Sequence, residues 1–343
     1  MSLDIVVGGQ YGSEGKGKIS RYLAEEYQLS IRTGGPNAGH TVEYRGNFYK
    51  LRSIPCGFVN ENCLLGIGPG AVIDLAVLRK EIKECKIGRD RLFIDPYVGI
   101  IEQKHRNAET ELKQLIGSTG EGVGAATACR VLRKDIMLAY VNKGLQDECC
   151  VRSVADLANH ALDLNKNVFL EGTQGFGLSL YHGKYPFVTS RDTTASALCS
   201  EAGISPRSVR EIMMVIRTYP IRTGGNSGPL KDEIDWETLT RDSKSPISIL
   251  EKTTVTGRIR RVAKFDIEEV KRAITVNRPT QLAVNFIDYI DNKDYGKSKY
   301  EELTQRSKHF IEMIENETGI PVTLIGTGPY NEHIIDLRNK GRQ

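Results

Sequence analysis

The sequence predicts an α/β fold with a largely parallel central sheet, flanked by helices and carrying long ligand-binding loops. Short β-branched runs alternate with longer amphipathic stretches over most of the 343 residues, a pattern typical of a parallel sheet covered by helices. Glycine-rich segments follow several of these runs, where open α/β sheets gather their ligand sites. No internal repeat or low-complexity linker divides the chain. We therefore expect residues 1–343 to form a single domain.

Each expected element follows from its residue pattern. Short apolar runs rich in branched side chains predict strands at Ile5–Val7, Leu64–Ile67, Leu92–Ile94, Val168–Leu170, Ile212–Ile216, Leu282–Phe286 and Val322–Ile325. Longer amphipathic stretches predict helices at Leu75–Cys85, Gln103–Leu115, Val154–Leu164, Ile267–Val276 and Tyr300–Thr318. Alternation on both sides of a turn at Arg45–Asn47 predicts a hairpin over Val42–Leu51.

Composition excludes several classes of protein. The net charge is +4, and no Lys/Arg block is interleaved with aromatic residues, which argues against direct nucleic-acid binding. The 7 cysteines include no C-x-x-C pair, a usage that suits a reducing compartment. The chain has neither a signal-like leader nor an apolar run of membrane-spanning length. We expect a soluble cytoplasmic protein, in the host cytoplasm if the chain is viral, with no membrane partner.

The first loop, residues 9–18 (GQYGSEGKGK), follows the first predicted strand and precedes an apolar periodicity at Ile19 and Leu23. Glycines let backbone N–H groups turn toward a phosphate, and a helix N-terminus with two lysines adds positive charge. An ordinary P-loop would need Gly in place of Gln10 and Ser or Thr in place of Gly17. The loop therefore predicts nucleotide binding through a different arrangement.

Four further glycine-rich segments carry polar side chains: residues 33–41, 117–124, 171–175 and 326–329. Each alone is weak evidence, because a glycine turn after a strand is usually structural. In chain order, the motifs GSEGKGK, NAGHT, GSTGEGVG, EGTQG with YPFVTS downstream, VTGRIRR and IGTGP resemble the adenylosuccinate synthetase family over essentially the whole chain. The resemblance implies that family's fold. It also implies a ligase in which a nucleoside triphosphate phosphorylates O6 of a 6-oxopurine nucleotide, after which the amine of aspartate displaces the phosphate.

The resemblance also assigns roles to residues. It implies Lys16 at the transferred phosphate, His40 as the acid that assists transfer, and Mg²⁺ held by the Gly39 carbonyl and Ser13. The purine nucleotide would contact Ser13, Asn37, Ser118, Thr119, Gln174 and Thr189, with Arg133 reaching across a homodimer interface. The triphosphate would contact Ser13, Glu14, Gly15, Lys16, Gly17, Lys18, Asp288, Gly326, Thr327 and Gly328. L-aspartate would be bound by Thr256, Gly257, Arg258, Arg260 and Arg261, because guanidinium groups suit a dicarboxylate.

Three positions depart from the family pattern. Ser13 replaces an aspartate that ligates magnesium and removes the N1 proton, and a hydroxyl cannot be an anionic base near neutral pH. A shorter serine leaves room for a purine 2-amino group, and Ile259 replaces an arginine near the ribose, which favours a sugar without its 2′-hydroxyl. Phe286 replaces a common lysine and weakens the inference of GTP use.

Together these departures predict the viral branch of the family, which converts dGMP to N6-succino-2-amino-2′-deoxyadenylate for DNA containing 2-aminoadenine. In that branch ATP or dATP is the donor. An IMP-specific synthetase with an unusual loop and a non-catalytic nucleotide-binding paralogue are the alternatives. The group that takes the N1 proton is left open among Glu14, the carboxylate of the substrate aspartate and a water held by Ser13.

Overall fold

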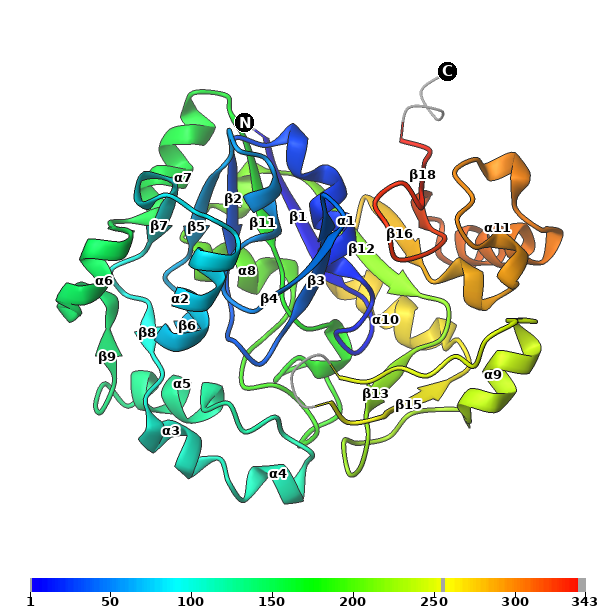
Figure 1. Ribbon diagram of the computed structural model, residues 1–343, viewed down its shortest axis with the longest axis horizontal. Coiled ribbons are helices and arrows are strands. Elements are labelled where there is room, and N and C mark those ends of the chain that lie inside the picture. Colours follow the sequence, from blue (N-terminus) through cyan, green and yellow to red (C-terminus); the bar gives the residue numbers. More distant parts are fainter. Residues whose placement is uncertain (1, 254–256, 339–343) are drawn as a thin grey trace.

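A ten-stranded sheet forms the centre of the molecule (Figure 1). The computed structural model describes residues 2–253 and 257–338. The strand order is β10 (Cys150–Val151), β7 (Leu92–Ile94), β5 (Leu64–Ile67), β2 (Leu29–Arg32), β11 (Asn167–Glu171), β1 (Ser2–Gly8), β12 (Val209–Arg217), β16 (Gln281–Asn285), β17 (Val322–Gly326) and β18 (Ile334–Asp336). All neighbouring strands are parallel except β17 and β18. The predicted fold class is confirmed.

Three smaller sheets lie around the central one. They are formed by β3 (His40–Tyr44) with β4 (Asn47–Leu51), by β6 (Val72–Ile73), β8 (Gly99–Ile100) and β9 (Met137–Leu138), and by β13 (Ile221–Thr223), β15 (Arg260–Ala263) and β14 (Glu233–Ile234). The pair β3–β4 is the predicted hairpin, with Val42 opposite Tyr49.

The α-helices are α1 (Lys16–Leu23), α2 (Leu75–Glu84), α3 (Gln103–Ala108), α4 (Leu112–Leu115), α5 (Val123–Val131), α6 (Lys143–Glu148), α7 (Val154–Asp163), α8 (Ala195–Ala202), α9 (Trp236–Asp242), α10 (Ile267–Asn277) and α11 (Gln305–Thr318). Short 3-10 turns include η2 (Cys56–Val59), η7 (Ile287–Tyr289) and η9 (Tyr300–Glu302). Among the residues described, no helix is long and apolar enough to cross a lipid bilayer.

The core lies on both faces of the central sheet, because alternate side chains of a strand point to opposite sides. Leu3, Ile5 and Val7 of β1 pack in one cluster with buried residues of α7, α8, α10 and α11. Val6 packs on the other face with Ile19 of α1. This two-sided burial fixes the register of β1 between β11 and β12, so the loop after β1 opens at the edge where the other parallel strands also end.

Two predicted helices are shorter than expected, and local hydrogen bonds give the reason. The stretch Gln103–Leu115 is divided into α3 and α4, because Glu109 turns its carboxylate toward the backbone N–H groups of Gly122, Gly124 and Ala125. In Tyr300–Thr318, the side chain of Thr304 caps α11, so that the helix starts at Gln305. The seven predicted strands are all present, whereas β2 and the sheet β13–β15–β14 were not predicted.

Candidate functional site

The cavity lined by most of the predicted purine-nucleotide residues, called the main cavity below, lies beyond the carboxyl ends of β1, β2 and β11 and has a volume of about 680 Å³. Loops that are far apart in the sequence form its wall, as expected for an open parallel sheet. The predicted site residues that line it are Ser13, Asn37, Gly39, Ser118, Thr119, Gln174, Thr189 and Arg260. Gln174 has a φ of 67°, a left-handed conformation that non-glycine residues adopt mainly where the surrounding structure holds them. The structure therefore gathers the predicted purine-nucleotide residues of one chain, apart from Arg133.

The first loop is braced from within by Glu14. Its Oε1 accepts hydrogen bonds from the backbone N–H groups of Gln10 (3.1 Å) and Gly12 (2.7 Å), and its Oε2 lies 2.7 Å from Lys16 Nζ. Both side chains are buried. Gly15 has a φ of 86° and leads directly into α1, which places the helix N-terminus next to the loop. Because its carboxylate is committed to these contacts, Glu14 is not placed to take a proton from a substrate.

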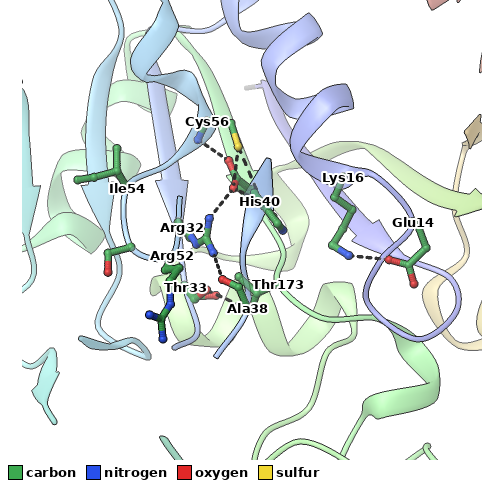
Figure 2. Close-up of polar contacts among 12 residues, drawn as sticks. Glu14, Lys16, Arg32, Thr33, Ala38, His40, Arg52, Ile54, Cys56 and Thr173 are labelled. Atoms are coloured by element: carbon green, nitrogen blue, oxygen red, sulfur yellow. Dashed lines mark hydrogen bonds and ion pairs between the residues drawn. The ribbon is translucent and has the colours of Figure 1, made fainter. Parts of the chain in front are cut away.

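A buried polar network surrounds His40 at the start of β3 (Figure 2). His40 Nδ1 lies 2.5 Å from Glu171 Oε1, and the same oxygen accepts a hydrogen bond from Arg32 Nη1 (3.1 Å). The backbone N–H of Cys56 donates to Glu171 Oε2 (2.7 Å). The second ring nitrogen of His40, Nε2, is buried and has no hydrogen-bond partner among the described residues. Such an unpartnered buried polar atom is costly, and a bound ligand would satisfy it.

The charges of this network favour a neutral histidine beside an ionised glutamate. Burial lowers the pKa of His40 to about 4, and the positive charge of Arg32 also lowers it. Burial opposes ionisation of Glu171, but the influence of His40, its hydrogen bond and Arg32 prevail and lower the pKa of Glu171 to about 2. Since Glu171 Oε1 can only accept a hydrogen bond, Nδ1 of a neutral His40 carries the proton and Nε2 presents a lone pair.

Lys18 and the predicted triphosphate residues outside the first loop form a second group at the ends of β16 and β17. Lys18 Nζ donates to the carbonyl oxygens of Gly328 and His333, each at 2.6 Å. Burial lowers the pKa of Lys18 to about 7 and raises the pKa of Asp288 to about 7. Asn285 Oδ1, Asp288 Oδ1 and His333 Nδ1 are buried without partners among the described residues. These unsatisfied atoms suit a ligand that donates several hydrogen bonds.

The predicted aspartate residues lie on a hairpin that leads into β15. Thr256 lies outside the described residues, whereas Gly257 and Arg258 are exposed. Arg260 lines the main cavity. Arg261 forms a bidentate pair with Glu233, with Nε–Oε1 at 2.8 Å and Nη2–Oε2 at 2.6 Å. Of the three arginines, only Arg260 therefore faces the cavity in this arrangement.

Arg133 is not brought to the cavity of its own chain. It is exposed, has a φ of 60° and follows the end of α5. Side chains exposed beside it include Val131 (71%) and Leu132 (63%).

Several residues that shape the site were not singled out from the sequence. Arg32 and Cys56 complete the His40 network, and Glu171 was quoted only as part of EGTQG. Arg217 donates from Nη1 to the carbonyl oxygen of Ser13 (3.0 Å). A usable signal was available for Arg32 and Arg217, because each is a charged residue at the last position of a buried strand.

The predicted protein ligands of Mg²⁺, which are the oxygens of Ser13 and Gly39, suit this ion only when substrates are also bound. Ser13 and Gly39 line the same cavity and offer a hydroxyl and a carbonyl oxygen. Mg²⁺ prefers hard oxygen ligands and commonly binds through a few protein oxygens, waters and substrate phosphates. Because these two protein oxygens are neutral, the negative charge has to come from the phosphates.

Known proteins resemble this chain over nearly its whole length. The model of the family described as adenylosuccinate synthetase matches residues 5–149 and 137–297. The chain belongs to the adenylosuccinate synthetase family. It is 43% identical to the adenylosuccinate synthetase of Methanocaldococcus jannaschii, over 99% of this chain and 98% of that protein.

Two solved structures resemble the fold. The fully ligated adenylosuccinate synthetase of Plasmodium falciparum superimposes with a TM-score of 0.87 at 22% identity, and covers 98% of this chain and all of that chain. The succinoaminodeoxyadenylate synthetase of cyanophage S-2L, bound to dGMP and dATP, superimposes with a TM-score of 0.84 at 28% identity, over 98% of this chain and 95% of that one. Family membership implies a ligase that forms a C–N bond and acts on nucleotide and aspartate in purine biosynthesis.

The prediction that dGMP is the substrate is wrong. The archaeal relatives at 41–43% identity are adenylosuccinate synthetases, whereas the cyanophage enzyme bound to dGMP is only 28% identical. The structure also removes one argument for dGMP, because the side chain of Ile259 is 53% exposed and does not line the main cavity. Ser13 alone does not outweigh similarity along the whole chain.

Proposed function

We propose that this chain joins L-aspartate to C6 of IMP and forms adenylosuccinate, with hydrolysis of a nucleoside triphosphate to the diphosphate and phosphate. The observation that carries the proposal is a phosphate loop placed beside a buried histidine whose second nitrogen is free. The archaeal relatives support IMP as the nucleotide. The proposal keeps the predicted site residues in the roles that the resemblance implied.

The first half of the reaction transfers a phosphoryl group to O6 of IMP. The N-terminus of α1 provides positive charge for the phosphates, as phosphoryl transfer requires, and Lys16 adds its charge when a phosphate replaces Glu14 as its partner. His40 is held by Glu171 with Nε2 as the free nitrogen. A bound dianionic phosphate raises the pKa of a neighbouring imidazole, because it stabilises the protonated form. His40 then donates a proton to O6 or to the phosphate during transfer.

In the second half, the amine of aspartate attacks C6, and the C6–O bond to phosphate breaks. Arg260 lines the cavity and provides a guanidinium group for a carboxylate of aspartate. The proton on N1 needs an acceptor, and Ser13 is no anionic base near neutral pH. Since Glu14 is committed to the loop, a carboxylate of the substrate aspartate or a water at Ser13 is the acceptor.

Mg²⁺ bound between Ser13, Gly39 and the phosphates would neutralise charge on the transferred group. We propose ATP or dATP as the donor, with its base in the group formed by Asp288, Gly326, Thr327 and Gly328. Support comes from Phe286, whose ring packs 3.9 Å from the Arg217 guanidinium carbon and offers no polar contact to a guanine.

A homodimer is part of the proposal, because Arg133 does not line the cavity of its own chain. Val131 and Leu132, the two residues that precede Arg133, carry exposed apolar side chains. An apolar patch with an arginine at its side is typical of protein interfaces. The variant Leu132→Asp should shift the protein to a monomer in analytical ultracentrifugation and reduce nucleotide affinity. An unchanged sedimentation coefficient and an unchanged affinity would remove this surface as the interface. We place the enzyme in the cytoplasm, as is usual for this family.

The test is a product assay with purified protein, L-aspartate, Mg²⁺, either IMP or dGMP, and ATP, dATP or GTP. We expect a succinyl product from IMP, most efficiently with ATP or dATP. Product from dGMP and none from IMP would overturn the proposal. Tight nucleotide binding without product from either would support a non-catalytic paralogue instead.

A further inference from the structure

We infer that Arg217 is a positioning residue that ties the phosphate loop to the hairpin carrying the aspartate-binding arginines. The inference rests on the proposed function for its kinetic readout, although the tie itself is a property of the structure. Arg217 is the last residue of β12 and its side chain is only 2% exposed. Arg217 does not itself line the main cavity.

On one side, Arg217 holds the first loop at two points. Its backbone N–H donates to Gln10 Oε1 (2.9 Å), and Gln10 Nε2 donates to its carbonyl oxygen (3.1 Å). Its Nη1 donates to the carbonyl oxygen of Ser13 (3.0 Å). The side chain of Gln10 and the backbone of Ser13 therefore follow the position of β12.

On the other side, the same guanidinium pairs with Glu251. Nη1 lies 3.3 Å from Glu251 Oε2, and Nη2 is bonded to Glu251 Oε1. Tyr289 also donates from its hydroxyl to Glu251 Oε1 (3.1 Å). The Coulomb attraction and the hydrogen bonds of Arg217 overcome the effect of burial and lower the pKa of Glu251, so that the carboxylate stays ionised.

Glu251 stands at the base of the aspartate hairpin. Its carbonyl oxygen accepts from the N–H of Arg260 (2.9 Å), and Lys252 forms a bridge with Ile259. Since Arg260 lines the main cavity, the orientation of its guanidinium depends on how this hairpin base is held. One buried cation thus sets the distance between Ser13 and Arg260, the two sides between which IMP and aspartate must react.

Packing holds the Arg217 guanidinium between Ser13 and Glu251. The Phe286 ring lies against the guanidinium, with 3.9 Å between its centroid and Arg217 Cζ. Phe286 itself has a φ of 63° at the start of η7, the turn that contains Asp288. A planar guanidinium can stack on this ring and bind two partners at once, whereas a lysine ammonium cannot do both.

The experiment compares Glu251→Gln, Arg217→Met and Arg217→Lys with Arg210→Met as a matched control. Arg210 lies at the other end of β12 and pairs with Asp4, away from the cavity. Steady-state kinetics give KM for aspartate, IMP and triphosphate. Hydrogen–deuterium exchange of peptides covering residues 8–16 and 248–262 shows, in the absence of substrate, how firmly the first loop and the hairpin are held.

For Glu251→Gln we expect KM for aspartate to rise about tenfold or more while KM for IMP and kcat change less than about threefold, a split typical of a lost binding interaction. Arg217→Met should raise KM for aspartate and also lower kcat, because Ser13 is released, and Arg217→Lys should recover only part of this loss. In Arg217→Met, hydrogen exchange should accelerate in both peptides. In Glu251→Gln, it should accelerate only in the peptide that covers residues 248–262. Arg210→Met should match the wild type in all these measurements.

An unchanged KM for aspartate in Glu251→Gln, with the wild type active, would refute the positioning role and leave the proposed function intact. A wild type that makes no product would refute the proposed function. In that case, hydrogen exchange alone would test whether Arg217 holds the first loop and the hairpin together. Equal exchange rates in Arg217→Met and Arg210→Met would show that it does not.

Discussion

The substitution Glu171→Gln tests the central network most directly. Glu171 is fully buried and accepts hydrogen bonds from His40, Arg32 and the Cys56 backbone. A glutamine has one oxygen and one NH₂ group, so in either orientation an N–H donor faces another donor. The change also leaves the buried Arg32 guanidinium without its counter-charge. Breaking a buried ion pair by removing one partner costs about 3–5 kcal/mol, and we expect a loss of this size in urea unfolding.

The same variant should lower kcat about a hundredfold, because His40 loses the acceptor that orients its ring, while general acid catalysis contributes at least this factor. KM for aspartate should change little. Cys56→Ala is the control: it keeps the carboxylate, removes only the thiol that lies 3.2 Å from Glu171 Oε1, and should cost about 1 kcal/mol with kcat nearly unchanged. If Glu171→Gln retained kcat within about twofold of the wild type, His40 would not depend on Glu171, and the assignment of its free nitrogen to catalysis would fail.

Three further predictions follow from the site. Because the pKa of His40 falls from 6.5 to about 4 on folding, the unfolded chain binds a proton that the folded chain does not. Stability should therefore decline as the pH drops from 6.5 to 4, by about 3 kcal/mol from this group. Urea titrations should show a flatter profile for His40→Gln, and equal slopes would contradict a neutral His40. Ser13→Asp should raise IMP turnover about tenfold or more by supplying a base at N1, whereas Ser13→Ala should not. Equal rates for wild type and Ser13→Asp would show that proton removal is not limiting. Chelation of Mg²⁺ should abolish product formation, and calorimetry should detect Mg²⁺ binding only with triphosphate present, since Ser13 and Gly39 offer neutral oxygens. Tight binding of the metal to the free protein would reveal a carboxylate ligand.

Local patterns in the sequence were sufficient for the fold class, whereas the roles of the purine-nucleotide residues came from the family resemblance and stay predictions. The period of the apolar residues decides which segments are buried strands, and parallel strands place the loops that follow them at one edge. The loops after β1, β2 and β11 meet there and bring Ser13, Asn37 and Gln174 to one cavity, in agreement with the family resemblance, although β2 was not predicted from the sequence. That the whole chain behaves as a single domain remains a prediction.

Tertiary structure alone decided which charged groups are free and which are occupied. Glu14 is a candidate base by sequence, yet its carboxylate binds the N–H groups of its own loop. Arg261 and Arg260 are neighbours in one motif, but Glu233 engages the first, whereas the second faces the cavity. The pair of Arg261 with Glu233 joins segments that are far apart in the chain, and no local pattern contains it.

The motif GSEGKGK in the first loop shows most clearly what the sequence predicted and what only the tertiary structure decided. By itself the sequence predicted that the loop binds phosphate, because glycines, lysines and a helix start are local features, and this role stays a prediction. The sequence did not determine the substrate. Ser13 and Ile259 predicted dGMP, which the similarity to archaeal adenylosuccinate synthetases and the exposure of Ile259 contradict. The structure placed the Ile259 side chain mostly in solvent and the Ser13 carbonyl against Arg217. Long-range packing decides what surrounds a residue, and the surroundings decide what that residue can recognise.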